Sequence, residues 1–248
     1  MGEIFHTTGI PPPYDPVQIV RYMLGRPLDF EPGARMAYSN LGYLVLGRVI
    51  EKVTRMDYEA WVRAVVLQPL HLESMKLGKA TWRDRETEEA RYHTHGDRMG
   101  LSLYDPFGPP VPYPYGAENF EGFEAHGGWI ATAADLARFA DAFHDPAKCP
   151  LLNPETIALM QARPEGVAGH EADGQPKAAY YGCGWMVRPV KDGQANLWHA
   201  GLIAGSESLV VKRWDGSSWA VLFNGNGTAQ GGNLSAAIDP LLHRALGR

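Results

Sequence analysis

The sequence is poor in cysteine and has no long apolar run. Its two cysteines, Cys149 and Cys183, are too few for a disulfide framework or for a metal site built of thiolates. No run approaches the roughly 20 apolar residues of a membrane-spanning helix, and residues 1–10 contain no apolar signal-peptide core. We therefore expect no membrane partner and, by default, a cytoplasmic location.

Clustered positive charge is also lacking. The chain carries 23 Lys and Arg against 28 Asp and Glu, a formal net charge of −5. Because no basic stripe is visible that would neutralise phosphates, nucleic acid is not an expected partner. With 248 residues and 45% apolar content, the chain can bury a sizeable core. These features favour one folded domain with a small-molecule substrate.

Periodic patterns predict helices first and strands afterwards. Apolar spacing and capping residues predict helices at 17–24, 41–54, 58–67, 132–143, from 154 onward and at 234–246. Alternation between turn residues predicts strands at 181–189, 196–199, 207–213 and 218–224. The predicted fold class is α+β, with a helical lobe at about 15–165 and an antiparallel sheet with a terminal helix at about 178–248. Residues 79–123 lack periodicity, which is typical of a functional or mobile segment.

The stretch from Phe30 to Asn40 holds two polar residues at the start of a predicted helix. Pro32-Gly33 predicts a turn. Asn40 occupies the expected cap position, because its short amide can accept from the free N–H groups of the first helical turn. Tyr38 and Asn40 are two residues apart, so both can point into one cleft.

This stretch, together with Gln68-Pro69-Leu70, resembles the serine β-lactamase and penicillin-binding protein superfamily in its class C and esterase branch. Three further segments resemble that family in the same order along the chain: His6-Thr7-Thr8-Gly9, Gly127-Gly128-Trp129 and Trp198-His199-Ala200-Gly201. The resemblance implies a β-lactamase-like fold. It also implies that Tyr38 is the general base, that Asn40 binds substrate, and that Trp129 and Gly201 line the substrate site.

The family's nucleophile motif, Ser-x-x-Lys, is missing, because no Ser or Thr has a Lys three residues later. In the family, this motif lies upstream of the loop that His6-Thr7-Thr8-Gly9 resembles, and its Lys activates the Ser for acyl transfer. Relative to the family, we therefore expect an N-terminal helix and strands to be missing. The sheet edge that they would leave exposed favours a homodimer or a rearranged edge.

Four histidines are candidate ligands for one metal ion: His93, His95, His126 and His199. Side chains two residues apart in an extended segment project to the same side, so His93 and His95 can hold one ion together. His199 borders the active site if the family geometry applies, and His126 precedes the Gly127-Gly128 segment. Converging imidazoles suit Zn²⁺, which is therefore the expected cofactor.

A zinc ion would define a mechanism without serine. It would lower the pKa of a bound water to about 7 and polarise the oxygen of the substrate. Tyr38 and Asn40 would then donate hydrogen bonds to the developing oxyanion, while Asp97, Glu121 and Glu124 are candidate ligands or partners of the imidazoles. This interpretation predicts a metal-dependent hydrolase of activated esters or phosphoesters, such as aryl esters and phosphotriesters.

Other interpretations stay open. The chain can be a catalytically dead binding domain, or an incomplete domain whose N-terminal portion is supplied elsewhere. It can also be a serine esterase with a substitute nucleophile, Ser39 or Ser206, and with Tyr38 or His199 as the base. A His-x-His pair in a polar loop is most often solvated, and His199 needs no metal to explain it. Fold analogy alone does not decide among these interpretations.

Overall fold

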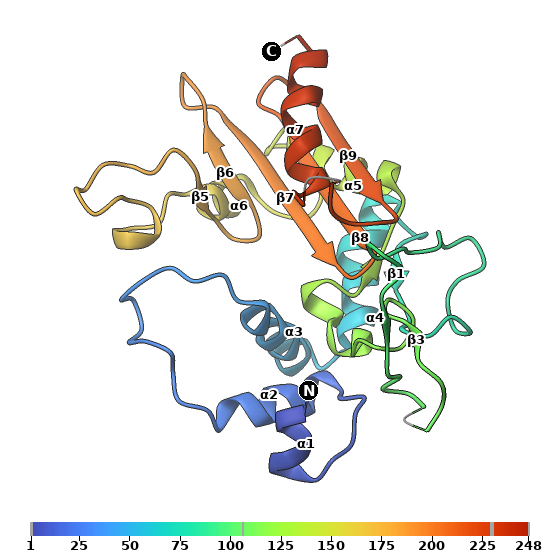
Figure 1. The fold of residues 1–248 in the computed structure, drawn as a ribbon. Helices are drawn as coiled ribbons and strands as arrows, with labels where there is room; N and C mark the ends of the chain where they lie inside the picture. The colour runs from blue at the N-terminus through green and yellow to red at the C-terminus, as the bar shows by residue number, and fades with distance from the viewer. Residues whose placement is uncertain (1, 106, 229–230, 248) are drawn as a thin grey trace.

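The computed structural model describes residues 2–105, 107–228 and 231–247, and they form an α+β fold (Figure 1). The α-helices are α1 (Gly2–Thr8), α2 (Pro16–Leu24), α3 (Asn40–Thr54), α4 (Tyr58–Val62), α5 (Ala133–Asp141), α6 (Pro154–Gln161) and α7 (Leu234–Ala245). The strands are β1 (Lys76–Leu77), β2 (Met99–Gly100), β3 (Val111–Pro112), β4 (Trp129–Ile130), β5 (Tyr180–Tyr181), β6 (Met186–Pro189), β7 (Ala195–Ile203), β8 (Ser206–Lys212) and β9 (Ser218–Phe223). The predicted fold class is confirmed.

Three predicted elements differ from the observed ones. The strand expected at 196–199 is longer, since β7 runs over Ala195–Ile203. The helix expected at 58–67 consists of α4 and a π-helical turn at Arg63–Leu67. The single strand expected at 181–189 is wrong, because β5 and β6 are separate antiparallel strands joined by a tight turn. Gly184 in this turn has a φ of +82°, a conformation that glycine adopts without steric cost.

The sheet has the order β5-β6-β7-β8-β9, and all neighbouring strands are antiparallel. Helices cover both faces (Figure 1). On one face, Ser218 of β9 contacts His144, just after α5, at 2.9 Å. On the other face, the next residue, Trp219, packs its ring edge-on against His243 of α7 at 4.9 Å between centroids. This alternation shows that α5 and α7 lie on opposite sides of the sheet.

The main core lies between the sheet, α5 and α6. Its buried residues are Ala140, Phe143, Ile157, Tyr180, Trp185, Val187 and Leu197. Leu197 of β7 is fully buried. Since strand side chains alternate, His199, two residues further along β7, faces the same side as Leu197, toward the helical part of the molecule. The core thereby fixes the direction in which His199 points.

Glu207 of β8 holds the start of α7. The N-cap residue of α7, Asn233, makes no side-chain capping bond. Instead, the carboxylate of Glu207, which is 1% exposed, accepts hydrogen bonds of 2.7 Å from both the backbone N–H and the hydroxyl of Ser235. Burial by itself raises the pKa of Glu207, but these hydrogen bonds outweigh it and leave the pKa below its ordinary value of 4.5. The negative charge also faces the positive end of the helix dipole.

The lowered pKa predicts a stability that depends on pH. In Glu207→Gln, we expect the free energy of unfolding to fall by about 1.5–3 kcal/mol at neutral pH, because hydrogen bonds to a charged group are lost. The contribution of the carboxylate is fully present above pH 4.5 and is lost as the pH falls through the lower folded pKa. Urea unfolding at neutral and at acidic pH measures this difference. The exposed Glu171→Gln is the control, and an equal loss at both pH values would contradict the account.

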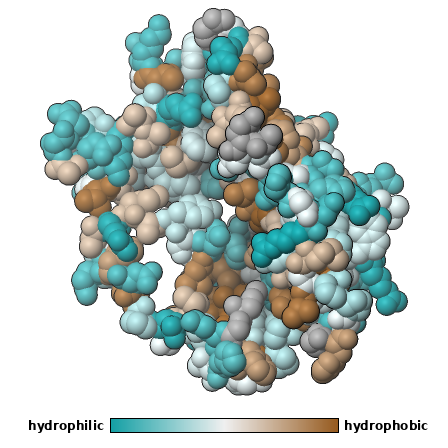
Figure 2. All heavy atoms as spheres, viewed as in Figure 1, coloured by the Kyte–Doolittle hydropathy of each residue, from teal (hydrophilic) through white to brown (hydrophobic). Residues whose placement is uncertain are grey.

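Helix α3 is apolar on two sides. Leu44 and Gly47 are buried on one side, whereas a second face, made of Val45, Leu46, Val49 and Val53, is between 37% and 76% exposed. Figure 2 shows the molecule hollowed beside this helix, with hydrophobic residues at the position that α3 has in Figure 1. A helix that is apolar all round is normally buried. We call these four residues the outer face of α3.

Two further observations concern the sequence predictions on partners. Within the described ranges, no helix is long and apolar enough to cross a membrane. Strands β5 and β9 form the two edges of the sheet. A homodimer through an exposed edge stays a prediction.

Candidate active site

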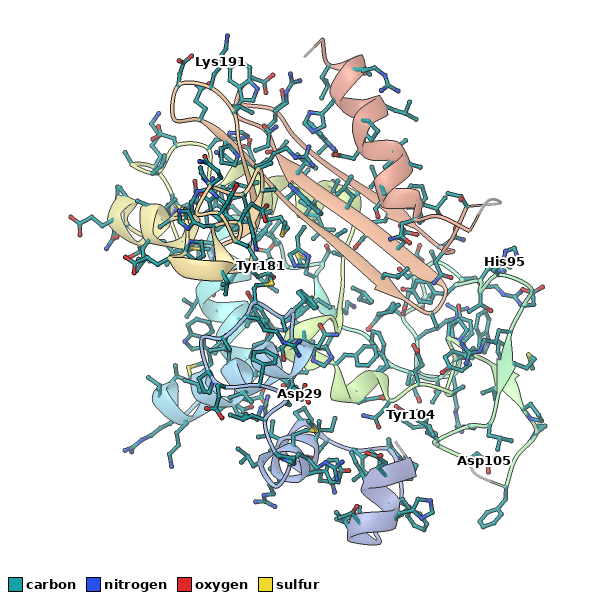
Figure 3. All side chains as sticks on the ribbon, turned by 60° about the vertical axis from the view of Figure 1, so that its left-hand side comes forward. Asp29, His95, Tyr104, Asp105, Tyr181 and Lys191 are labelled. Atoms are coloured by element: carbon teal, nitrogen blue, oxygen red, sulfur yellow. The ribbon has the colours of Figure 1, made fainter. Side chains whose placement is uncertain are left out.

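Three aromatic rings from distant parts of the chain meet beside the sheet. Tyr38 precedes α3, Tyr181 belongs to β5, and His199 belongs to β7. The centroid of the Tyr38 ring lies 5.9 Å from that of Tyr181 and 6.4 Å from that of His199. The rings of Tyr181 and His199 are 5.7 Å apart, and both pairs that involve Tyr181 have edge-on geometry. Figure 3 shows Tyr181 between the sheet and the segment that leads into α3.

The start of α3 fixes the position of Tyr38. The predicted cap at Asn40 is wrong by one residue: Ser39 is the N-cap, and its hydroxyl accepts from the N–H of Gly42 at 3.1 Å. Asn40 is the first residue of the helix, and its side chain is exposed. Ser39, one of the two substitute nucleophiles considered, is therefore already engaged as a capping group.

His199 is held at both ring nitrogens. Its Nδ1 lies 2.8 Å from the carbonyl oxygen of Ala200, and its Nε2 lies 2.9 Å from the hydroxyl of Tyr181. Burial lowers the pKa of His199, although the bond to Ala200 acts in the opposite direction. The pKa of Tyr181 is raised by burial and by hydrogen bonding to Tyr43. Both groups are therefore neutral at neutral pH.

Tyr38 is not activated as a base in this structure. Partial burial, followed by the neighbouring hydroxyl of Tyr43, raises its pKa above the ordinary value of 10, although the residue is 57% exposed. In the described part of the chain, no cation offsets these effects. A tyrosine acts as a general base only as phenolate, which a nearby positive charge favours. Tyr38 thus lies beside His199 but is held as a phenol.

The two residues predicted to line the substrate site differ in position. Gly201 lies on β7, two residues after His199 and on the same face, and a Cβ there would approach the Ser208 hydroxyl to 2.4 Å. Trp129 instead packs beside the buried cluster around Leu67, and its indole N–H donates to Tyr58 at 3.2 Å. Within the described ranges, no ring contact or hydrogen bond joins Trp129 to the three aromatic rings.

The four histidines predicted as zinc ligands are not brought together. His93 lies beside the end of β9, where its backbone N–H donates to the carbonyl oxygen of Asn224 at 3.0 Å. Its ring is half-exposed. Its backbone also borders Gly205, at the turn between β7 and β8. The end of β7 at Ile203 lies roughly 13 Å from His199 along the strand, at about 3.3 Å per residue. His93 is therefore remote from His199. Figure 3 shows His95 on the long loop, well apart from Tyr181.

His126 has surroundings of its own. It belongs to the 3₁₀ helix Glu124–His126, packs against Phe123 at 5.2 Å, and has a pKa that burial lowers. The candidate partner Glu124 pairs with Arg48, Glu121 accepts from the hydroxyl of Tyr104, and Asp97 lies 3.9 Å from His93. Among the residues that the structure describes, no group of three or more His, Cys, Asp or Glu side chains could hold a metal ion. Zinc binding stays a prediction without a converged ligand set.

Sequence reasoning missed Tyr181 and Tyr43. Tyr43 is in the first turn of α3, and its hydrogen bond to Tyr181 connects the helix to the sheet. The only signal in the sequence was the pair Tyr180-Tyr181 ahead of two glycines. Tyr181 was predicted to begin one longer strand at 181–189, and this prediction missed the turn after Tyr181.

Comparison with known proteins decides the family. The family model described as Beta-lactamase matches residues 4–241. The chain belongs to the β-lactamase family. This is a family of hydrolases, and the predicted β-lactamase-like fold is thereby confirmed.

Solved structures of this family share the fold of the chain. A D-amino acid amidase from Ochrobactrum anthropi, solved with L-phenylalanine amide, superposes with a TM-score of 0.68 at 19% identity, over 98% of this chain and 66% of the amidase. A penicillin-binding protein homologue from Pyrococcus abyssi, which is octameric, superposes with a TM-score of 0.66 at 23% identity, over 99% of this chain and 51% of that protein.

A sequence relative is considerably longer than this chain. A predicted D-alanyl-D-alanine carboxypeptidase from Salmonella paratyphi B is 21% identical over 230 residues. The matched region covers 89% of this chain and 46% of the relative. The chain thus spans about half the length of the curated relatives that it matches.

The raised pKa of Tyr38 predicts how this residue ionises. In an ultraviolet titration, the difference between the wild-type chain and Tyr38→Phe isolates one tyrosine. We expect it to lose its proton above pH 10, because burial and Tyr43 both disfavour the phenolate. Tyr22→Phe, whose hydroxyl donates to Glu3 on the surface, is the matched control. A pKa of Tyr38 below the ordinary value of 10 would show that the chain already activates it as a base.

Proposed function

We propose that this chain forms the general-base and substrate-binding side of a serine hydrolase that cleaves amide bonds of D-amino-acid compounds. The observation that carries the proposal is the meeting of Tyr38 and His199, which come from opposite ends of the chain. The family resemblance assigns the role of base to Tyr38 and includes His199 in the segment Trp198-His199-Ala200-Gly201. The D-amino-acid substrate class is supported by the names of the amidase and of the carboxypeptidase relative.

The proposed reaction takes its serine from polypeptide outside these 248 residues. In acyl transfer, the serine hydroxyl attacks the amide carbonyl, its proton passes to the base, and the base then protonates the leaving amine. Tyr38 needs a neighbouring cation to become the phenolate that accepts this proton, and its raised pKa indicates that the residues described by the structure supply none. A Ser-x-x-Lys segment would bring both the nucleophile and the cation.

The outer face of α3 is where we place that segment. Its four apolar side chains lie on the helix that starts beside Tyr38 and carries Tyr43. A segment that covered this face would remove apolar surface from water, and its end would reach the three rings. The greater length of the relatives supports such an additional segment.

Metal-dependent hydrolysis is not the function that the geometry favours. Both nitrogens of His199 are hydrogen-bonded within the chain, and His93 lies at the far end of β7. No step of the proposed reaction is therefore assigned to a metal. Zinc binding, and with it the hydrolysis of phosphotriesters, stays a separate prediction that elemental analysis of the purified protein tests.

The proposal predicts that the chain alone binds substrate without cleaving it. We expect D-phenylalanine amide to shift the NMR signals of Tyr38 and His199. We expect Tyr38→Phe to weaken binding about threefold to tenfold, the effect of one lost hydrogen bond. Tyr22→Phe should bind like the wild type. The proposal is wrong if the amide does not bind, or if the chain alone hydrolyses it. A chelator that stops such hydrolysis and added metal that restores it would then favour the metal-dependent interpretation.

The proposal also predicts assembly on the outer face of α3. The portion of the Ochrobactrum amidase without a counterpart here, expressed separately, should bind this chain, and Val49→Asp should abolish that binding. Because Val49 is 47% exposed, we expect its substitution to change the free energy of unfolding by less than about 0.5 kcal/mol. Leu159→Asp, at a 72% exposed position of α6, is the control. Absence of assembly, or equal assembly of both variants, would count against this placement.

A further inference from the structure

A continuous hydrogen-bonded path connects α3, β5 and β7. Tyr43 of α3 hydrogen-bonds to Tyr181 of β5. The hydroxyl of Tyr181 lies 2.9 Å from Nε2 of His199, and Nδ1 of His199 lies 2.8 Å from the carbonyl oxygen of Ala200. The path joins the helical part of the molecule to the sheet at the three aromatic rings.

The last link fixes where the imidazole proton lies. A carbonyl oxygen can only accept a hydrogen bond, so Nδ1 of His199 must carry the proton and donate it to Ala200. In the neutral ring, Nε2 then has a free electron pair and accepts from the hydroxyl of Tyr181. The hydroxyl of Tyr181 is also hydrogen-bonded to Tyr43. The Ala200 carbonyl thus sets the direction of the bond between Tyr181 and His199.

We propose that Tyr181 is a positioning residue for the proposed reaction: its hydroxyl occupies Nε2 of the neutral His199 ring, and its own ring sets that of His199 against Tyr38. The same Tyr181 ring contacts Tyr38 edge-on at 5.9 Å and His199 edge-on at 5.7 Å. Tyr181 therefore fixes the spacing of the two rings to which the proposed function assigns roles. With Nε2 occupied, His199 is not free to take a proton until the Tyr181 hydroxyl turns away.

The neighbouring tyrosine provides a matched control. Tyr180 precedes Tyr181 on β5 and is buried in the main core. Its hydroxyl donates to the carbonyl oxygen of Gln161 at the end of α6, at 2.8 Å. Tyr180→Phe and Tyr181→Phe thus remove the hydroxyl oxygen from adjacent residues, but only Tyr181→Phe removes a hydrogen bond to His199.

Two measurements test the role of Tyr181. In ¹⁵N NMR of the wild type, we expect widely separated signals for the two nitrogens of His199, with the proton on Nδ1. In Tyr181→Phe, the Nε2 signal should move, because this nitrogen loses its donor, whereas the bond from Nδ1 to Ala200 keeps the proton on Nδ1. The rate at which diethyl pyrocarbonate modifies His199 should rise about threefold to tenfold, the effect of one lost hydrogen bond. His93, which is half-exposed, is the internal reference in the same digest.

The outcomes separate this inference from the proposed function on which it rests. The inference stands if Tyr181→Phe changes both readouts and Tyr180→Phe changes neither, with both variants folded by circular dichroism. It is overturned if His199 of Tyr181→Phe keeps the wild-type signals and reactivity, or if Tyr180→Phe has the same effect. Neither readout requires turnover or D-phenylalanine amide. A failure of the amide to bind would therefore overturn the proposed function, while the ¹⁵N signal of Nε2 would still decide the role of Tyr181.

Discussion

The alternation of side chains along β7 is the constraint on which the site depends. Leu197 is fully buried in the core beneath α5 and α6, and this contact sets the rotation of the strand. His199, on the same face, then points toward the helices. Gly201 follows on that face, where a side chain would collide with the hydroxyl of Ser208. A slip of one residue in the register would turn His199 toward α7. The same packing that stabilises the core therefore also sets the direction of His199.

None of the three aromatic rings, Tyr38, Tyr181 and His199, carries a charge at neutral pH. The pKa values of Tyr38 and Tyr181 are raised and that of His199 is lowered, chiefly by burial in each case. All three groups are therefore neutral at neutral pH, whereas acyl transfer needs a base that can accept a proton. A cation beside Tyr38 would change this, and the uncovered face of α3 lies next to the place where it is needed. The proposed function accounts for the uncovered helix and the inactive base together.

The sequence predicted the helices and strands better than it predicted which of their residues come together in space. Helix α3 followed from its apolar spacing, and its cap was misplaced by one residue because Ser39 and Asn40 are equally suitable caps. The turn at Gly184 was missed because aromatic and β-branched residues surround it. The pairing of Tyr38 with His199 came from the family resemblance, since no local pattern relates residues so far apart. The convergence of the histidines assumed a chain path through 79–123, and periodicity says nothing about the path of an irregular segment.

The source of the nucleophile is the central claim, and covalent labelling tests it most directly. The chain would be treated with a fluorophosphonate or a β-lactam, alone and together with a separately expressed Ser-x-x-Lys segment, and the adduct located by mass spectrometry. The account predicts no adduct on the chain alone and, in the mixture, an adduct on the serine of the added segment that requires Tyr38. An adduct on Ser39 or Ser206 of the chain alone would contradict it and would identify this protein as a serine hydrolase with its own substitute nucleophile.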